Sequence, residues 1–230
     1  AVRKGRDQRS TLFCAEPLLD AEHPLLEQRC EREAEEGAAE RDEADLTEHE
    51  TGSETVFQGK LLQVKRDTVR LPDGKPATRE YIQHNGAVMI IPLLESGELV
   101  MERQYRYVMR RHCIEFPAGK IDAGEEPLAA GRRELLEETG YVAREWIYLT
   151  SINPTVAYST ERILVYLARG LEQRESKLDE GEFLEVLKLT PAALLELVRA
   201  GEIGDVKTVI GALWMEKLQR GDWAAGPVLP

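Results

Sequence analysis

A short glutamate-rich segment constrains the fold more than any other part of the chain. Pro127 suits the first position of a helix, and Gly140 suits the position just after a helix end. Between them, Glu134, Glu137 and Glu138 are spaced i, i+3 and i+4, so their carboxylates share one helix face. Like charges on one face repel each other, but carboxylate oxygens are good ligands for Mg²⁺ or Mn²⁺. The segment therefore predicts a helix whose acidic face is either simply solvated or binds a divalent cation.

Apolar patterns on both sides of this helix predict β-strands. Residues 56–70 alternate between apolar and polar, and Leu71–Lys75 has the proline and glycine of a tight turn, so a hairpin should continue through Thr78–His84. Further strands are expected at Gly86–Leu94, Glu98–Arg106, Trp146–Ile152, Arg162–Ala168 and Glu182–Leu189, further helices at Pro191–Ala200 and Val206–Trp214, and a polar loop at Gly170–Gly181. Strands mixed with a few helices predict an α+β fold.

The N-terminal part of the chain differs in composition from the rest. Between Glu27 and Glu50, eleven acidic residues stand against three arginines, and this stretch carries most of the net charge of −12. Segments of this composition cannot bury enough apolar surface to fold alone. We therefore expect an acidic, disordered tail over residues 1–53, a folded domain over 54–220 and a C-terminal tail over 221–230.

Charge, hydropathy and cysteine usage bear on partners and compartment. The sequence has no run of lysine and arginine of the kind that binds nucleic acid. Its longest apolar run, Gly86–Leu94, is far shorter than the roughly 20 residues of a membrane span. Cys14, Cys30 and Cys113 have no metal-type spacing and fit a reducing compartment. We expect a cytoplasmic protein that binds neither nucleic acid nor membranes.

The residues around the glutamate helix fill a longer pattern. In the order Gly-x5-Glu-x7-Arg-Glu-apolar-x-Glu-Glu-x-Gly-apolar, they are Gly119, Glu125, Arg133, Glu134, Leu135, Glu137, Glu138, Gly140 and Tyr141. Each specified residue type has a background frequency of about 5–7%, so a chance match at one starting position is roughly one in a hundred million. The pattern resembles the signature of the Nudix hydrolases and departs from it only at Tyr141, where an aliphatic residue is more usual.

This resemblance implies the Nudix fold, a mixed β-sheet sandwiched between α-helices, here with an N-terminal antiparallel β extension. It also implies Mg²⁺-dependent hydrolysis of a nucleoside diphosphate linked to another moiety, with Mn²⁺ as a substitute. By the family's pattern, the metal ligands would be the Ala118 carbonyl, Glu134, Glu137, Glu138 and Glu182, and the catalytic residues would be Glu182, Glu137 and Arg133. Arg133 is expected to pair with Glu125 and so orient the helix.

Outside the signature, further segments resemble the ADP-ribose pyrophosphatase branch of the family. They are Leu71–Lys75 with Thr78–Glu80, Arg103–Arg106, Glu115–Gly119 and Gly204–Thr208. The resemblance implies a homodimer that splits ADP-ribose, a nucleotide sugar, into AMP and ribose 5-phosphate. Arg79 and Glu80 would reach the nucleotide from the partner subunit, and Arg106 would contact the diphosphate or ribose. The alternatives are a cross-strand surface ion pair for Arg79–Glu80 and a surface or dimer-interface charge at Arg106.

Two glutamates are candidates for the general base. Glu182 matches the branch's usual base, in which case Glu161 would be a substrate contact. Thr155 stands where the branch usually has a glycine after proline, so the substrate preference stays open. The alternative functions are a Nudix pyrophosphatase for other nucleoside diphosphate sugars or dinucleotides, and a non-catalytic Nudix module that binds ADP-ribose.

Overall fold

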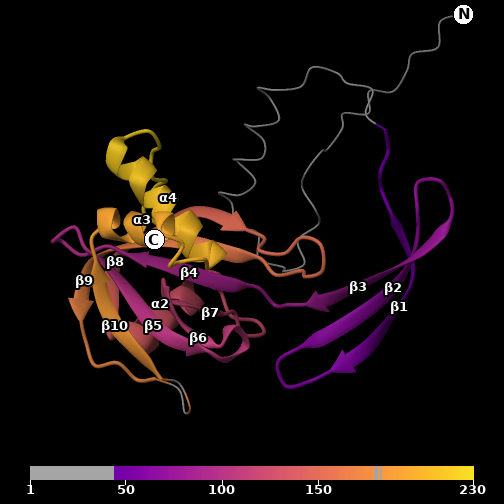
Figure 1. The fold of residues 1–230 in the computed structure, drawn as a ribbon, viewed down its shortest axis with the longest axis horizontal. Helices are drawn as coiled ribbons and strands as arrows, with labels where there is room; N and C mark the ends of the chain where they lie inside the picture. Colours follow the sequence, from indigo (N-terminus) through magenta and orange to yellow (C-terminus); the bar gives the residue numbers. More distant parts are fainter. Residues whose placement is uncertain (1–43, 179–180, 182) are drawn as a thin grey trace, which may run out of the picture. The chain divides into compact units, whose positions relative to one another are not determined.

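The computed structural model describes residues 44–178, 181 and 183–230. The chain divides into two compact units, residues 1–47 and 48–230, and the helices and strands described below belong to the second unit (Figure 1). Most of the expected acidic tail lies outside the described residues. The first strand, β1, occupies His49–Gln58. The boundary placed at residue 53 therefore falls inside β1, whose residues pair with the next strand although their composition is acidic.

The strands of this unit form three sheets, and one of them is mixed. The first sheet has the order β1, β2 (Gln63–Arg70) and β3 (Pro76–Gln83); the second has β10 (Leu184–Leu189), β5 (Leu99–Arg106) and β6 (Arg111–Glu115); the third has β7 (Ala118–Lys120), β4 (Ala87–Pro92), β9 (Ile163–Gln173) and β8 (Tyr141–Ile152). Strands β4 and β9 are parallel, and the other neighbouring pairs are antiparallel. The helices are α2 (Pro127–Thr139), α3 (Pro191–Arg199), α4 (Val206–Arg220) and the short 3₁₀ turn η1 (Tyr107–Met109).

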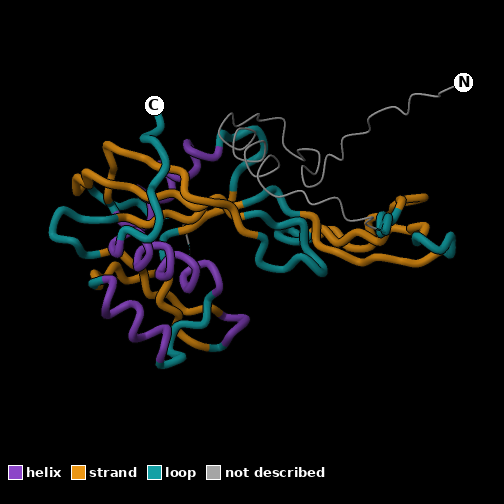
Figure 2. Tube along the Cα trace, turned by 90° about the horizontal axis from the view of Figure 1, so that it is seen from above, coloured by secondary structure: helices purple, strands orange, loops and turns teal. Residues whose placement is uncertain are grey.

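Helices cover both faces of the mixed sheet. Successive residues of a strand point to opposite faces, so the apolar residues of β4 and β9 are shared between two cores. Met89 and Val165 belong to the core that contains residues of α3 and α4, whereas Ile90 and Tyr166 belong to the core that contains residues of α2. Figure 2 shows helices on both sides of the strands. The predicted sandwich of a mixed sheet between helices is confirmed.

Most of the predicted elements are present, and the differences lie at short or polar segments. The hairpin and the helix over 127–139 are confirmed. The predicted loop was wrong over its first four residues, because β9 continues to Gln173, which pairs with Tyr141 at the start of β8. Strands β6 and β7 were not predicted, since they are too short to show a period. Among the described residues, no helix is both long and apolar enough to span a membrane.

The C-terminal segment packs on β8. The Leu229 N–H donates to the Trp146 carbonyl over 2.7 Å, and Val228 forms an isolated bridge with Ile147. Residues 221–230, expected as a tail, therefore add main-chain contacts to the edge of the mixed sheet.

The end of α2 is tied to the segment that follows β9. Gly140 has a φ of 72°, and its N–H donates to the Leu136 carbonyl. Its own carbonyl accepts a 2.6 Å hydrogen bond from the Arg174 N–H, while the Lys177 N–H donates to the Glu137 carbonyl over 3.2 Å. A Cβ at Gly140 would lie 2.9 Å from the Arg174 carbonyl oxygen. Glycine is therefore required here for both its backbone angle and its lack of a side chain.

Gly140→Ala should destabilise the protein more than Gly221→Ala. Gly221 ends α4 with nearly the same φ, 71°, but a Cβ there meets nothing within 4 Å. Gly221→Ala should therefore cost only the strain of the left-handed conformation, about 1 kcal/mol of unfolding free energy. Gly140→Ala should cost at least about 1 kcal/mol more, because it also displaces backbone. Urea unfolding of both variants measures the difference, and equal losses would contradict the close packing at Gly140.

Candidate active site

A cleft of about 570 Å³ lies beside α2 and is lined mainly by polar residues from distant parts of the chain. They include Gln104 and Arg106 of β5, Ala118, Gly119 and Lys120 of β7, Arg133, Glu134, Glu137 and Glu138 of α2, Glu161 before β9, and Asp205 and Lys207 at the start of α4. Every predicted metal ligand except Glu182 lines this cleft. Glu182 lies outside the described residues, so its predicted roles as base and metal ligand stay predictions.

Arg133 connects the acidic residues of the cleft. Its Nε and Nη2 each donate to the Glu125 carboxylate over 2.9 Å, so the expected pair is present. Its Nη1 donates to Glu134 over 2.8 Å and to Glu137 over 3.1 Å. The hydrogen bonds to Glu125 raise the pKa of Arg133 most, and the hydrogen bond to Glu134 raises it further. The hydrogen bonds from Arg133 in turn lower the pKa of Glu125. One guanidinium thus offsets much of the repulsion among the carboxylates of α2.

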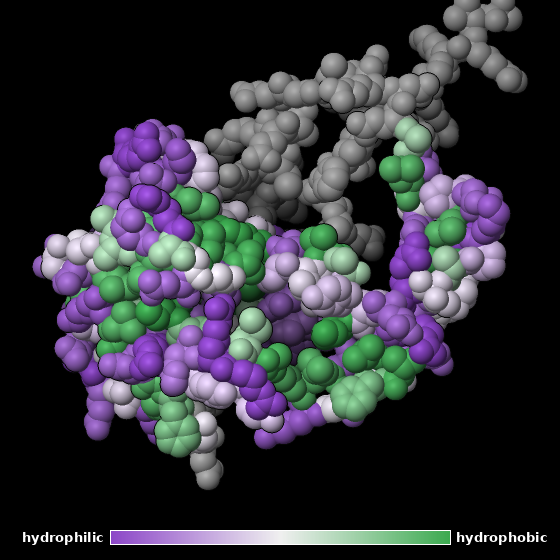
Figure 3. Space-filling view, in the orientation of Figure 1, coloured by the Kyte–Doolittle hydropathy of each residue, from purple (hydrophilic) through white to green (hydrophobic). Residues whose placement is uncertain are grey.

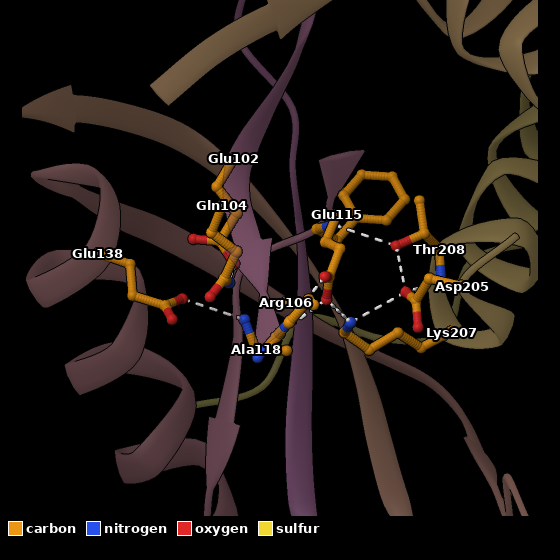
Figure 4. A network of polar contacts seen from close by, with 10 residues as sticks. Glu102, Gln104, Arg106, Glu115, Ala118, Glu138, Asp205, Lys207 and Thr208 are labelled. Carbon is orange, nitrogen blue, oxygen red and sulfur yellow. Dashed lines mark hydrogen bonds and ion pairs between the residues drawn. The ribbon is translucent and has the colours of Figure 1, made fainter. Parts of the chain in front are cut away.

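Two neighbouring residues of β7 fit closely against two of these glutamates. The Glu134 carboxylate lies against Gly119, where an added Cβ would be 1.8 Å from its Oε1. The Ala118 N–H donates to Glu138 Oε2 over 3.1 Å (Figure 4). The Ile90 N–H donates to the Pro117 carbonyl. Because pairing alternates along an antiparallel ladder, both backbone polar groups of Ala118 are directed away from β4. Its carbonyl therefore points to the side from which Glu138 approaches.

The donor atoms of this site fit a hard divalent cation. Three carboxylates and a main-chain carbonyl are the oxygen ligands that Mg²⁺ accepts, usually together with substrate phosphate. Glycine at position 119 leaves room for the Glu134 carboxylate, which no other residue would allow in this arrangement. Across the described residues, no three His, Cys, Asp or Glu side chains are gathered at metal-binding distances. The carboxylates of α2 instead accept hydrogen bonds from Arg133 and Ala118.

A second polar network lies across the cleft. Arg106 donates from Nε and Nη2 to the two oxygens of Glu115, each over 2.8 Å, and the Lys207 ammonium also contacts Glu115. Glu115 is 2% exposed. Burial alone would raise the pKa of this carboxyl, but the hydrogen bond from Arg106 and the charge of Lys207 lower it to about 2. Arg106 therefore lines the cleft as an ion-paired residue.

Sequence reasoning assigned no role to the partners of Arg106. Glu115, Asp205 and Lys207 lie inside segments that were noted only for their family resemblance. One signal was present, because an aspartate directly before a predicted helix is a preferred N-cap. Asp205 is the N-cap of α4 and accepts from the Thr208 N–H over 3.1 Å. The pairing of Glu115 with Lys207 had no such signal, since the two residues are far apart in sequence.

Arg79 and Glu80 do not line the cleft. They line a separate hollow of about 280 Å³ together with Tyr81 and residues 156–160. Arg79 pairs with Glu48 on the N-terminal side of β1, and Glu80 pairs with Arg66, its partner across the β2–β3 ladder. Within one chain, Arg79 and Glu80 are therefore in surface ion pairs, and that of Glu80 is cross-strand, as the alternative for these two residues expected.

Gly119→Ala should impair catalysis while leaving the fold intact. The new methyl group would displace only the end of the Glu134 side chain, which can rotate away without moving backbone. Displacing a catalytic group by about 1 Å can cost roughly a hundredfold in rate. We expect that loss in turnover with a melting temperature close to that of the unsubstituted protein. Gly52→Ala, where a Cβ meets nothing within 4 Å, is the control and should keep full activity. Normal turnover in Gly119→Ala would contradict a role for this contact.

Comparisons with known proteins identify two regions of the chain. The model of the NUDIX domain matches residues 83–208, and the nucleoside diphosphate sugar hydrolase N-terminal domain matches residues 48–82. The boundary between the two matches falls at the end of β3. The NUDIX match contains α2 and all of the residues that line the cleft.

Individual relatives agree with these matches. The chain is 36% identical over 173 residues to the ADP-ribose pyrophosphatase of Bacillus subtilis (strain 168), which covers 74% of this chain and 94% of that protein. It is 32% identical over 162 residues to the ADP-sugar pyrophosphatase of Mus musculus, with 63% and 74% covered. A solved structure of an ADP compounds hydrolase has the same fold, with a TM-score of 0.71 at 23% identity, and covers 78% of this chain and 98% of its own.

The NUDIX match spans more than half of the chain, and three of the signature glutamates, Glu134, Glu137 and Glu138, lie together on α2 beside the cleft. The chain belongs to the Nudix hydrolase family.

Proposed function

We propose that this protein is a Mg²⁺-dependent pyrophosphatase that splits ADP-ribose into AMP and ribose 5-phosphate. The observation that carries the proposal is the single cleft that the α2 carboxylates, Ala118 and Arg106 line together. The names of the relatives, an ADP-ribose pyrophosphatase and an ADP-sugar pyrophosphatase, support an ADP-linked sugar as substrate. A volume of about 570 Å³ is in the range of small-molecule sites.

Different residues of the cleft would bind the cation and the diphosphate. Glu134, Glu137 and Glu138, with the Ala118 carbonyl, would hold Mg²⁺, or Mn²⁺ in its place. When bound, the cation supplies positive charge that stabilises the negative charge developing on the leaving phosphate. Arg106 would bind the diphosphate from the opposite wall, because a guanidinium fits phosphate oxygens in a fork. Arg133 holds the α2 carboxylates in position through its hydrogen bonds to Glu125 and Glu134.

Hydrolysis requires a base for the attacking water. The water oxygen forms a bond to phosphorus, the bridging P–O bond breaks, and the water proton passes to the base. We assign this role to Glu182, with Glu161 as a substrate contact. Glu161 lines the cleft and is half-buried, which supports its contact role. A Glu161→Gln variant that loses all turnover but still binds substrate would exchange the two roles.

The protein should release AMP and ribose 5-phosphate from ADP-ribose with Mg²⁺ and release neither with excess EDTA. Glu138→Gln should lower turnover by about a hundredfold or more, since it removes a charged metal ligand. Glu196→Gln is the matched control, because Glu196 lies exposed on α3 and, among the described residues, forms an ion pair with Arg199 alone. Chromatographic product analysis of all three proteins checks these expectations.

Other results would select among the alternatives. Faster cleavage of another nucleotide sugar or of a dinucleotide would keep the family chemistry and change the substrate. Binding of ADP-ribose without cleavage of any compound would favour the non-catalytic module. Near-normal turnover of Glu138→Gln at an unchanged melting temperature would contradict its assignment as a metal ligand.

We further propose that the protein works as a homodimer. The only buried residues of β1, β2 and β3 are Asp67 and Val69, so this sheet lacks a packed core of its own. Apolar side chains nearby are exposed, including Phe57 at 54% and Leu61 at 66%, and Figure 3 shows apolar side chains on the surface of the molecule. Three strands need packing on one face to be stable, and a second copy of the chain would supply it.

The homodimer gives Arg79 and Glu80 a role that they lack within one chain. Both lie outside the cleft of their own chain, and we propose that they reach the nucleotide in the cleft of the partner.

Mixing two impaired variants tests this arrangement. Glu138→Gln and Arg79→Ala should each have low activity alone. A mixed dimer would hold one site with both residues intact, so activity should rise after the variants are unfolded and refolded together. Light scattering of the unsubstituted protein should give twice the mass of 26.0 kDa. A monomer, or a mixture no more active than its parts, would overturn the shared site.

A further inference from the structure

The network around Glu115 balances four buried or partly buried charges. Glu115 and Asp205 are carboxylates, and Arg106 and Lys207 are cations. The Lys207 ammonium contacts both carboxylates, at 2.9 Å in the case of Asp205, although Lys207 is only 8% exposed. Burial alone would lower the pKa of Lys207, but the charges of Asp205 and Glu115 raise it. Lys207 is therefore held as a buried cation between two carboxylates.

The same network fixes the start of α4 to the end of β6. Asp205 Oδ2 accepts from Lys207 and from the Thr208 hydroxyl, which lies 2.6 Å away. The Thr208 hydroxyl oxygen in turn accepts from the Phe116 N–H over 3.2 Å. Residues 115 and 116 are thus each joined to the first turn of α4, as Figure 4 shows. These links immediately precede Ala118 on the cleft wall.

Arg106 has one edge engaged in this network and another edge available. Its Nε and Nη2 are bonded to Glu115, whereas its Nη1 donates no hydrogen bond to any residue in the described part of the chain. The side chain is 43% exposed and lines the cleft. Because residues two apart share a face of a strand, Arg106 lies on the same face of β5 as Gln104, which also lines the cleft. The available edge can receive a phosphate oxygen pair.

The available edge of Arg106 can attract an anion only if the negative charge of the nearby carboxylates is partly neutralised. Glu102 and Glu115 are opposite each other in the β5–β6 ladder, and both are buried. Like charges at directly opposite positions repel each other, so a neighbouring cation stabilises them. Glu102 and Asp205 both act on Arg106 electrostatically, in addition to Glu115. Lys207 offsets this negative charge, because its ammonium contacts Asp205 and the same Glu115 oxygen, Oε2, that accepts from Arg106 Nη2.

We propose that Lys207 is a positioning residue for the diphosphate. It holds Glu115 in the orientation that braces Arg106, and it offsets the charge that would otherwise reduce the attraction of Arg106 for phosphate. This inference rests on the proposed function, in which Arg106 binds the diphosphate. Lys207 acts through Arg106 and not through the metal ligands, so its loss should weaken binding more than it slows chemistry.

Lys207→Met removes the charge while keeping an unbranched chain of similar length. The KM for ADP-ribose should rise by about tenfold or more, the equivalent of one lost charged contact. The kcat should stay within about threefold, because the α2 carboxylates are untouched. The Kd for ADP-ribose, measured by calorimetry in EDTA where no hydrolysis occurs, should rise by the same factor as KM. Lys217→Met is the control, since Lys217 lies on the same helix, pairs with Asp222 and does not line the cleft.

A double-mutant cycle separates positioning from a general structural role. If Lys207 acts through Arg106, then Lys207→Met should change Kd by less than about twofold in an Arg106→Gln background. A purely structural role would give the same fold-change in both backgrounds. Lys207→Gln, which keeps a hydrogen-bond donor, replaces the Met variant if that variant does not fold.

The outcomes also separate this inference from the proposed function. If the unsubstituted protein binds ADP-ribose in EDTA but does not cleave it when Mg²⁺ is present, the proposed activity is refuted. The Kd values of the variants would still test the role of Lys207. An unchanged Kd in Lys207→Met, or additive effects in the cycle, would overturn the positioning role. If the unsubstituted protein does not bind ADP-ribose, both proposals fall.

Discussion

The ion pairs of Arg133 are the interaction on which the cleft depends. Three glutamates within two turns of α2 repel each other, and a helix gains little from such a face unless cations lie beside it. Arg133 lies one residue before the first of them and reaches Glu125 in the preceding loop as well as Glu134 and Glu137. A single side chain therefore fixes the loop to the helix and keeps the acidic face compatible with a folded α2. With that face fixed, β7 can approach closely enough for Gly119 and Ala118 to contact it.

Ion pairs between basic side chains and carboxylates occur on both walls of the cleft, but the balance of charge differs between them. On the α2 wall, one arginine is shared among several carboxylates, which leaves an excess of negative charge suited to a cation. On the opposite wall, two cations meet two carboxylates, and the edge of Arg106 faces the cleft. A diphosphate with its cation would thus meet an acidic wall on one side and a guanidinium on the other. Complementary charges of this kind orient a ligand as well as bind it.

The sequence predicted the parts of the structure that depend on local rules. Pro127 and Gly140 define the ends of α2 through backbone angles alone, and the continuous apolar runs of β4 and β9 follow from burial on both faces. It could not predict that β9 extends to Gln173, because that extension depends on pairing with Tyr141.

The site shows the same division between local and long-range information. The carboxylates of α2 were found because their spacing follows the helix, and Ala118 because it precedes the signature glycine. The Glu115–Lys207 contact joins residues 92 positions apart, and the partners of Arg79 and Glu80 come from strand register. No local pattern encodes such contacts. They form when sheets and helices pack, so they can be identified only from the three-dimensional structure.

The junction between α2 and the segment after β9 places unequal demands on its residues. Arg174 and Lys177 are held there by their backbone N–H groups, which every residue except proline possesses. Their side chains could therefore change widely during divergence without loosening the junction. Gly140 has no such freedom, because both its φ and the approach of the Arg174 carbonyl exclude a side chain. Substitutions other than proline should therefore be tolerated at Arg174 and Lys177, whereas substitutions at Gly140 should not.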